Sequence, residues 1–379
     1  MTRFILTWPA DCGPHRKGRM TSLHTNDSTA SLHTNDSTVR TQLMKRWILP
    51  ADATDAAGLV LDETPVPVPG PGEVRIRVRA ISMNYRDQLI LKGPFGRLPA
   101  RDLVPLSDVA GEIDAVGPQV RGWSVGDRVT NLHVLDWSDG RPPAAMGLGL
   151  GALHEDGVLA EYVVLPARRI MRAPANLDHS EAATLPVAAL TAWNALYGDH
   201  PITADSTVLI IGSGGVALSA LQLARAAGAR VYAAVRNDAA GEALVRLGAA
   251  GYVNSTTEHD WGDAIFALSG GVDKVVDSVG VSILAQALAA LAPGGEVATL
   301  GLFDATGGPL DGYALLGKQA RIRGVAVGSE AMHRDLVRHV ETHDIHPVID
   351  RRIGFLEAPA AYAAQTAGGL FGKVVIELG

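Results

Sequence analysis

The chain has 379 residues, of which 47% are hydrophobic and 19% charged, and its formal net charge at pH 7 is −7. This composition is typical of a globular protein long enough for two domains, whereas the negative charge argues against a nucleic-acid or anionic-membrane surface and no apolar run is long enough to cross a bilayer. Cys12 is the single cysteine, which excludes intramolecular disulfides and multi-cysteine metal sites and is typical of a cytoplasmic protein.

The N-terminal segment does not have the pattern of a folded domain. Residues 22–29, Ser-Leu-His-Thr-Asn-Asp-Ser-Thr, recur word for word at 31–38. Such polar sequence buries too little apolar surface to offset the entropy of ordering the chain. We therefore expect residues 1–43 to form a disordered tail whose histidines are solvated rather than metal ligands.

A β-rich pattern begins at Met44. Residues 73–80 alternate between polar and apolar side chains, which predicts a strand with one buried face. Shorter strand-like runs, separated by glycines, follow at 110–117, 127–130 and 160–165. Around Ser180 the apolar spacing becomes helical, and Ser180 is the expected N-cap.

Strands and helices then alternate. The predicted strands span 208–211, 231–235, 251–254, 274–277, 296–300 and 321–325, with helical stretches between most of them. Six such strands predict an open, doubly wound parallel sheet. A further helix at 332–341 and a last strand at 373–378 follow, and we expect that strand to return to the β-rich domain.

A glycine-rich turn joins the first of these strands to its helix. The turn comprises Gly212, Ser213, Gly214, Gly215, Val216 and Ala217. In a dinucleotide-binding turn of this type, the first glycine permits the tight turn, the second lets the backbone approach the pyrophosphate, and the last small residue keeps the helix close to the strand. We expect all six residues to contact a dinucleotide.

The end of the next strand bears on the choice of cofactor. NAD-preferring chains carry an acid there that binds the ribose 2′-hydroxyl, but this chain has Arg236 and Asn237. A guanidinium can bind a 2′-phosphate through charge-assisted hydrogen bonds. We therefore expect NADP(H) to be preferred over NAD(H), with a solvated loop charge as the alternative for Arg236 because Asp238 is close by.

From Met44 to Gly379 the chain resembles the medium-chain dehydrogenase/reductase family, in its zinc-free quinone oxidoreductase and enoyl reductase branch. The matching motifs, in chain order, are P-x-P-G-P-G-E-V at 67–74, N-Y-R-D at 84–87, P-L-S-D-V-A-G at 105–111, V-G-D-R-V at 125–129, G-V-L-A-E-Y at 157–162, A-A-T-L-P-V-A-A-L-T-A-W at 182–193, the glycine turn, A-P-G-G at 292–295 and F-G-K-V-V-I at 371–376.

The resemblance implies an α/β fold of two domains. A GroES-like, β-rich catalytic domain is expected at 44–170 and 329–379, and a doubly wound Rossmann cofactor domain at 171–328. It also implies that Lys373 contacts the cofactor, the alternative being a charge at the edge of a strand.

The zinc-binding relatives in this family hold their catalytic metal with a Cys, a His and a Cys or Asp. The matching positions here are Asn84, Ser107 and Val187, which form a poor ligand set because zinc in a catalytic site needs three protein ligands. We therefore expect no zinc. Alcohol oxidation is disfavoured, because no Lewis acid would polarise the alcohol oxygen.

Hydride transfer to an already activated double bond needs no metal, because hydrogen-bond donors can stabilise the enolate that forms. The resemblance places Asn84 and Tyr85 at the nicotinamide site, where Asn84 would bind the substrate carbonyl or the ribose. Tyr85 would donate a hydrogen bond or shape the pocket wall. Many enoyl thioester reductases carry a tyrosine where this chain has Phe95, so water is an alternative proton source.

Other polar residues have weaker assignments. Thr191 is expected to face the nicotinamide, unless it only bonds to its own helix backbone. Asp87 and Asp108 are interpreted as structural carboxylates, and the His339, His343 and His346 series is not expected to bind metal. The loop at 133–151 is expected to cap the substrate cleft.

These observations favour a zinc-independent, NADPH-dependent oxidoreductase that reduces a quinone or an activated C=C bond. An NAD(P)-dependent alcohol dehydrogenase for a small alcohol or aldehyde and a non-catalytic NADP-binding protein remain the alternatives. The expected partner is a small electrophilic molecule, not nucleic acid or a membrane, and we expect a homodimer in the cytoplasm.

Overall fold

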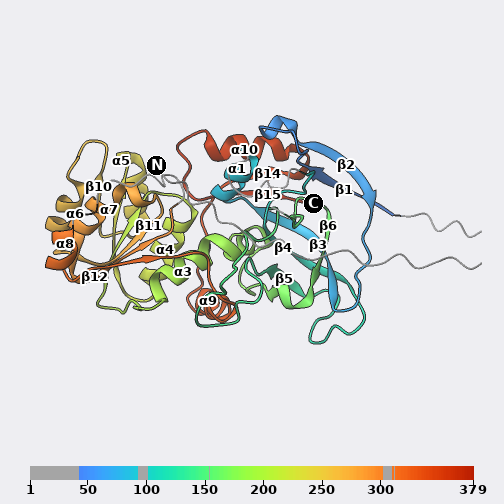
Figure 1. Ribbon diagram of the computed structural model, residues 1–379, viewed down its shortest axis with the longest axis horizontal. Coiled ribbons are helices and arrows are strands. Elements are labelled where there is room, and N and C mark those ends of the chain that lie inside the picture. The colour runs from blue at the N-terminus through green and yellow to red at the C-terminus, as the bar shows by residue number, and fades with distance from the viewer. Residues whose placement is uncertain (1–41, 93–100, 153, 302–309, 311) are drawn as a thin grey trace, which may run out of the picture. The chain divides into compact units, whose positions relative to one another are not determined.

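The computed structural model describes residues 42–92, 101–152, 154–301, 310 and 312–379 (Figure 1). Residues 1–41 of the expected tail and the Phe95 position lie outside these ranges, whereas the whole 133–151 loop lies within them. The tail prediction also included Leu43, which is the first residue of strand β1. Across the described ranges, no helix is long and apolar enough to cross a membrane.

The N-terminal half of the chain and its last two strands build a largely antiparallel sheet. Its strands are β3 (Glu73–Ser82), β4 (Asp108–Val116), β5 (Arg128–Asn131), β6 (Tyr162–Pro166), β7 (Ile170–Arg172), β14 (Ile349–Gly354) and β15 (Lys373–Glu377). The order is β14-β15-β3-β4-β5-β7, with β6 paired to β3. The alternation predicted for β3 is present, since Val74, Ile76 and Val78 are buried.

Shorter elements complete this core. They are β1 (Leu43–Ile48), β2 (Val60–Pro65), η1 (Ala56–Gly58), α1 (Tyr85–Leu91), η2 (Ala167–Arg169), η5 (Phe355–Glu357) and α10 (Ala358–Thr366). β1 and β2 form a separate antiparallel ribbon. The expectation of only one helix and one strand after the parallel sheet is wrong, because β14 and α10 also lie there.

A helical connection leads from this sheet to the next. It contains α2 (His179–Ala182), the π-helix η3 (Leu185–Ala189) and α3 (Leu190–Tyr197). The predicted N-cap is wrong: Asp178 caps α2, accepting a 2.7 Å hydrogen bond from the Glu181 N–H while the Glu181 carboxylate accepts one of 2.9 Å from the Asp178 N–H. Ser180 instead donates to Glu377 at 2.6 Å.

The second large sheet is parallel throughout. Its strands are β8 (Thr207–Ile211), β9 (Arg230–Val235), β10 (Gly251–Asn254), β11 (Val272–Asp277), β12 (Leu291–Thr299) and β13 (Arg321–Gly324). The spatial order β10-β9-β8-β11-β12-β13 is the 3-2-1-4-5-6 order of a Rossmann sheet. The predicted fold class is confirmed.

Both faces of this sheet are covered. The helical segments are α4 (Gly215–Ala226), α5 (Asp238–Arg246), α6 (Trp261–Ser269), η4 (Val281–Ile283), α7 (Leu284–Ala290), α8 (Gly312–Gly317) and α9 (Glu330–Thr342). On β8, Val208 and Ile210 face a core shared with α3, α4 and α9. Leu209 and Ile211 face the opposite core, shared with α6 and α7, so the helices lie on both sides as a doubly wound fold requires.

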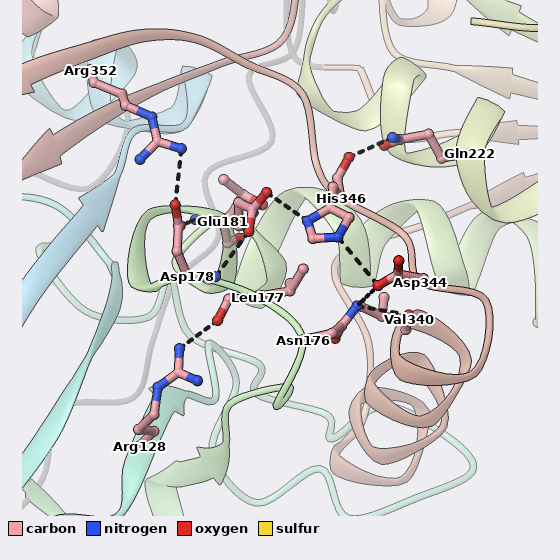
Figure 2. A network of polar contacts seen from close by, with 11 residues as sticks. Arg128, Asn176, Leu177, Asp178, Glu181, Gln222, Val340, Asp344, His346 and Arg352 are labelled. Atoms are coloured by element: carbon pink, nitrogen blue, oxygen red, sulfur yellow. Dashed lines mark hydrogen bonds and ion pairs between the residues drawn. The ribbon is translucent and has the colours of Figure 1, made fainter.

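The chain passes between the two large sheets twice, before β8 and after β13, and polar contacts join the two connections (Figure 2). His346 Nδ1 lies 2.9 Å from Glu181 Oε1. Asn176 donates to Asp344 at 3.1 Å, and Gln222 on α4 donates to the His346 carbonyl at 2.6 Å. The hydrogen bond to Glu181 raises the pKa of His346 above its ordinary value.

Candidate active site

The glycine turn lies where the strand order of the parallel sheet reverses, between β8 and β11. Gly212 has φ of 83°, a conformation that favours glycine. Gly214 is the N-cap of α4, and a Cβ built on it would meet nothing within 4 Å. The turn therefore leaves open space at the N-terminus of a 12-residue helix, which fits the pyrophosphate of a dinucleotide.

The C-terminal F-G-K segment runs alongside this turn. Gly372 N–H donates to the Ser213 carbonyl at 3.0 Å, and Ser213 Oγ donates to the Leu370 carbonyl at 3.3 Å. A Cβ added to Gly215 would lie 2.3 Å from Lys373 Cδ. Position 215 therefore has to be glycine, because the Lys373 side chain crosses the start of α4 and leaves no room for a Cβ. The sequence did not reveal this reason.

Lys373 is a buried cation, and not a charge at an exposed strand edge. Only 6% of the residue is exposed. Its Nζ donates to Asn84 Oδ1 at 2.7 Å and also to the Met83 carbonyl. Burial lowers the pKa of Lys373, and the charges of Asp108 and Asp87 oppose that effect.

The backbone of Asn84 is held by the acid that follows it. Asp87 Oδ2 accepts from the Asn84 N–H at 2.7 Å, and Asp87 Oδ1 accepts from Arg86 at 3.0 Å. Arg86 also donates to the carbonyls of Leu148 and Leu150, at 2.7 and 3.1 Å. Burial raises the pKa of Asp87, opposed most by the charge of Arg86. These contacts agree with the structural role predicted for Asp87.

Asp108 forms hydrogen bonds with Ser107 and Val187, the other two positions at which zinc-binding relatives carry ligands. Its Oδ1 accepts from Ser107 Oγ at 2.7 Å, and its Oδ2 accepts from the Val187 N–H at 3.2 Å. Complete burial raises the pKa of Asp108 to about 6, although the charge of Lys373 and the nearby Asn84 amide lower it. Asn84, Ser107 and Val187 thus lie around one buried carboxylate and one buried ammonium.

This arrangement does not fit a catalytic zinc ion. The three side chains are an amide, a hydroxyl and an isopropyl group, and the amide oxygen already accepts a hydrogen bond from the Lys373 ammonium. A dication would have to displace that cation and would lack thiolate or imidazole ligands. Nowhere in the described ranges do three or more His, Cys, Asp or Glu side chains form a group suited to a metal ion.

The other two predicted catalytic residues lie on helices. Tyr85 is the first residue of α1 and is partly exposed. Thr191 is buried at the start of α3, and its hydroxyl donates to the Val187 carbonyl at 2.6 Å. That hydrogen bond matches the alternative in which Thr191 only bonds to its own helix. The catalytic roles of both residues remain predictions.

The predicted cofactor-specificity residues lie at the carboxyl end of β9. Arg236 is exposed, and its carbonyl accepts from Thr256 Oγ at 2.9 Å. Asn237 caps α5 by accepting from the Ala240 N–H at 2.9 Å. Desolvation raises the pKa of Tyr252, and the charge of Asp238 raises it further.

In the glycine turn, Val216 is partly buried and Ala217 is 1% exposed, as expected for a residue that lets helix and strand approach.

Several buried polar atoms near the site were not anticipated. Ser82 Oγ, Asn84 Nδ2, Thr130 Oγ1 and His133 Nδ1 have no hydrogen-bond partner among the described residues. The His133 ring lies against Gly149, where an added Cβ would come within 2.5 Å of it. No sequence motif indicates that these atoms are buried, because their burial depends on the pairing of distant segments.

Two family models match the chain. The alcohol dehydrogenase GroES-like domain matches residues 70–175, and the zinc-binding dehydrogenase domain matches residues 215–342. The zinc-type alcohol dehydrogenase-like protein C1773.06c of Schizosaccharomyces pombe is 37% identical over 308 residues, which span 79% of this chain and 89% of that protein. Human quinone oxidoreductase is 29% identical over 225 residues, 59% of this chain and 62% of that protein.

A solved structure shows the same fold. The cobalt- and zinc-bound thermostable alcohol dehydrogenase of Pyrobaculum aerophilum is 29% identical and superposes with a TM-score of 0.76, over 89% of this chain and 100% of that one. The Rossmann sheet and the glycine turn define an oxidoreductase for which a pyridine nucleotide cofactor is expected. The chain belongs to the medium-chain dehydrogenase/reductase family.

Proposed function

We propose that this protein is a zinc-independent oxidoreductase that uses NADPH to reduce a quinone or a C=C bond conjugated to a carbonyl. The observation that supports the proposal most is the Lys373 ammonium, which lies 2.7 Å from Asn84 Oδ1 at a position where zinc-binding relatives carry a metal ligand. With a cation and an amide at this position, the side chains suit a substrate whose own carbonyl accepts the developing charge.

The glycine turn and the F-G-K segment would hold the cofactor. Gly214 and the first turn of α4 offer open space and the N-terminal N–H groups of a helix for the pyrophosphate. When bound, NADPH supplies the hydride. The exposed Arg236 guanidinium at the end of β9 would select the 2′-phosphate of NADP(H), since the acid that binds a 2′-hydroxyl is missing there.

Asn84 would act on the substrate oxygen. Its amide nitrogen is buried and has no hydrogen-bond partner among the described residues, so an oxygen that accepts from it would be stabilised as negative charge develops. Tyr85 would donate a second hydrogen bond or the proton that completes the reduction, with water as the other proton source. Thr191 would contribute to the wall on the nicotinamide side.

An NAD(P)-dependent alcohol dehydrogenase is the second candidate. It is favoured by the names of the similar proteins, one of which is described as a cobalt- and zinc-bound alcohol dehydrogenase. The side chains at 84, 107 and 187 argue against this candidate.

The proposal further includes a homodimer located in the cytoplasm. Light scattering would test the dimer, and cell fractionation would test the location.

Stopped-flow oxidation of NADPH and NADH tests the proposed activity. The purified full chain would be mixed with 1,4-benzoquinone, trans-2-hexenal, 2-cyclohexenone and an enoyl thioester, and with ethanol and butanol in the oxidative direction. We expect turnover of at least one electrophile with NADPH and none of the alcohols. Alcohol oxidation without any alkene or quinone reduction would contradict the proposal.

A further inference from the structure

The Asn84 side chain can present either of two chemical ends to a ligand. Its oxygen only accepts hydrogen bonds, whereas its nitrogen carries two N–H donors. A ribose hydroxyl, which both donates and accepts, could bind either end of the amide, whereas a substrate carbonyl, which only accepts, can bind the nitrogen end alone. The contacts around Asn84 decide which end is presented.

Lys373 holds one end of the amide. An ammonium has donors and no acceptor, so its 2.7 Å contact with Asn84 requires the amide oxygen to face Lys373. The reverse orientation would bring the amide N–H groups against the ammonium, which is repulsive. The second contact of Nζ, with the Met83 carbonyl, keeps the ammonium in place.

The other end of the amide is left as a donor. Asn84 Nδ2 lies close enough to Asp108 to lower the pKa of that carboxyl, but by distance and angle it makes no full hydrogen bond with any described residue. Even if one N–H turned towards Asp108, the second would remain. An unpaired buried donor is costly, so such a group is expected to bind water or a ligand.

We propose that Lys373 is a positioning residue that fixes the Asn84 amide with its nitrogen towards the reacting oxygen, so that Asn84 acts as a donor and not as an acceptor. This inference rests on the proposed function and names the chemistry that the site selects, which is an oxygen that gains negative charge. It differs from the role that family resemblance implies for Lys373, which is contact with the cofactor.

A double-mutant cycle on turnover tests the inference. The proteins are the unmodified chain, Asn84→Ala, Lys373→Met and the double variant, assayed with 2-cyclohexenone at saturating NADPH. If Lys373 acts through Asn84, Lys373→Met lowers kcat on the order of 10-fold or more, and the double variant is no slower than Asn84→Ala. Lys373→Arg, which keeps a cationic donor, restores most of the loss.

Binding of NADPH, measured by fluorescence, separates the two roles of Lys373. If Lys373 only contacts the cofactor, Lys373→Met raises the Kd for NADPH and leaves kcat at saturating NADPH unchanged. That result would overturn the proposal. Lys274→Met is the matched control, because Lys274 is also buried and donates to Glu296 at 2.8 Å, away from the glycine turn. Glu296 keeps Arg323 as a partner at 3.1 Å in that variant, so the fold should be retained and kcat unchanged.

Thermal unfolding of the same four proteins without cofactor gives a measurement that does not depend on activity. If the Lys373–Asn84 contact exists, the fall in Tm of the double variant is smaller than the sum of the two single falls. Additive falls in Tm would overturn the inference whether or not the enzyme turns over. Absence of turnover in the unmodified chain together with a non-additive Tm cycle would reject the proposed function and leave the orientation of Asn84 supported.

Discussion

Asn84 is constrained at three points, through its backbone N–H, its side-chain oxygen and its place before α1. Asp87 accepts from the backbone, and Lys373 donates to the side chain, both at 2.7 Å. A side chain held in this way loses little conformational freedom when a ligand binds, which is the usual basis of catalytic preorganisation. Tyr85 is adjacent in sequence and begins α1.

Substitution of Asn84 and Tyr85 tests their assignment. Asn84→Ala should lower kcat/KM for an enone on the order of 10- to 1000-fold, the range seen when an oxyanion donor is removed, while the Kd for NADPH changes far less. Tyr85→Phe removes only a hydroxyl, so a large fall in kcat with little change in KM identifies a transition-state donor. If enone reduction is unchanged in both variants, the reacting pocket lies elsewhere.

Arg236 offers a second test at the level of one side chain. If its guanidinium binds the 2′-phosphate, Arg236→Ala should weaken NADPH binding about 10- to 100-fold, the range expected for a hydrogen bond to a charged group. NADH, which lacks the phosphate, serves as the matched control and should bind almost unchanged. Equal affinity of the unmodified protein for both cofactors, measured by fluorescence titration, would refute the proposed preference.

Helix α9 contains a buried titratable group away from the site. It begins after the N-cap Ser329, and His333 in its first turns is 0% exposed with no partner for either ring nitrogen among the described residues. Burial lowers the pKa of His333 from 6.5 to about 4. Because the unfolded chain binds this proton more tightly, the stability contributed by neutral His333 is complete above pH 6.5 and is lost as the pH falls towards 4.

The pH dependence of unfolding tests this account of α9. A pKa difference of about 2.5 corresponds to about 3 kcal/mol in total, of which about 2 kcal/mol should be lost between pH 8 and pH 5. Urea unfolding of His333→Leu should show that much less loss over the same interval than the unmodified protein. His259→Gln, at an exposed position before α6, is the control and should keep the original slope; an equal slope in His333→Leu would disprove the assignment.

Elements with strong local signals were predictable from the sequence. The glycine turn and the six strands of the parallel sheet were identified because their spacing is local, and the φ of Gly212 agrees with its assigned role. Strand β14 was missed because four of its six residues, Asp350, Arg351, Arg352 and Gly354, are exposed and give no apolar alternation. α10 was missed because its alanine-rich sequence has no clear apolar face.

The candidate site could be predicted only in part. Asn84, Ser107 and Val187 were identified from the motifs that contain them, and they do lie around Asp108. Their link to Lys373 could not be predicted, because it depends on strand β15 lying beside β3 and on the F-G-K segment lying beside the glycine turn. These are non-local pairings that a single sequence does not specify.

At the scale of the whole molecule, the site is assembled from distant parts of the chain. Residues from α1, the start of β4, the π-helix and β15 meet at the Asn84, Asp108 and Lys373 cluster, and the glycine turn adjoins it through Gly215. The chain crosses between the two large sheets before β8 and after β13, and the His346 network joins these two connections (Figure 2). The proposed function would bring cofactor and substrate together where the glycine turn adjoins this cluster.

Zinc content and activity measured on one sample test the central claim most directly. The purified protein would be dialysed against a chelator, its zinc determined by elemental analysis, and its NADPH-dependent reduction of an enone or quinone assayed before and after. We predict zinc far below one atom per chain with the rate unchanged, because the side chains at 84, 107 and 187 form no zinc ligand set. Stoichiometric zinc that is lost together with activity, and activity that returns when zinc is added, would contradict the account.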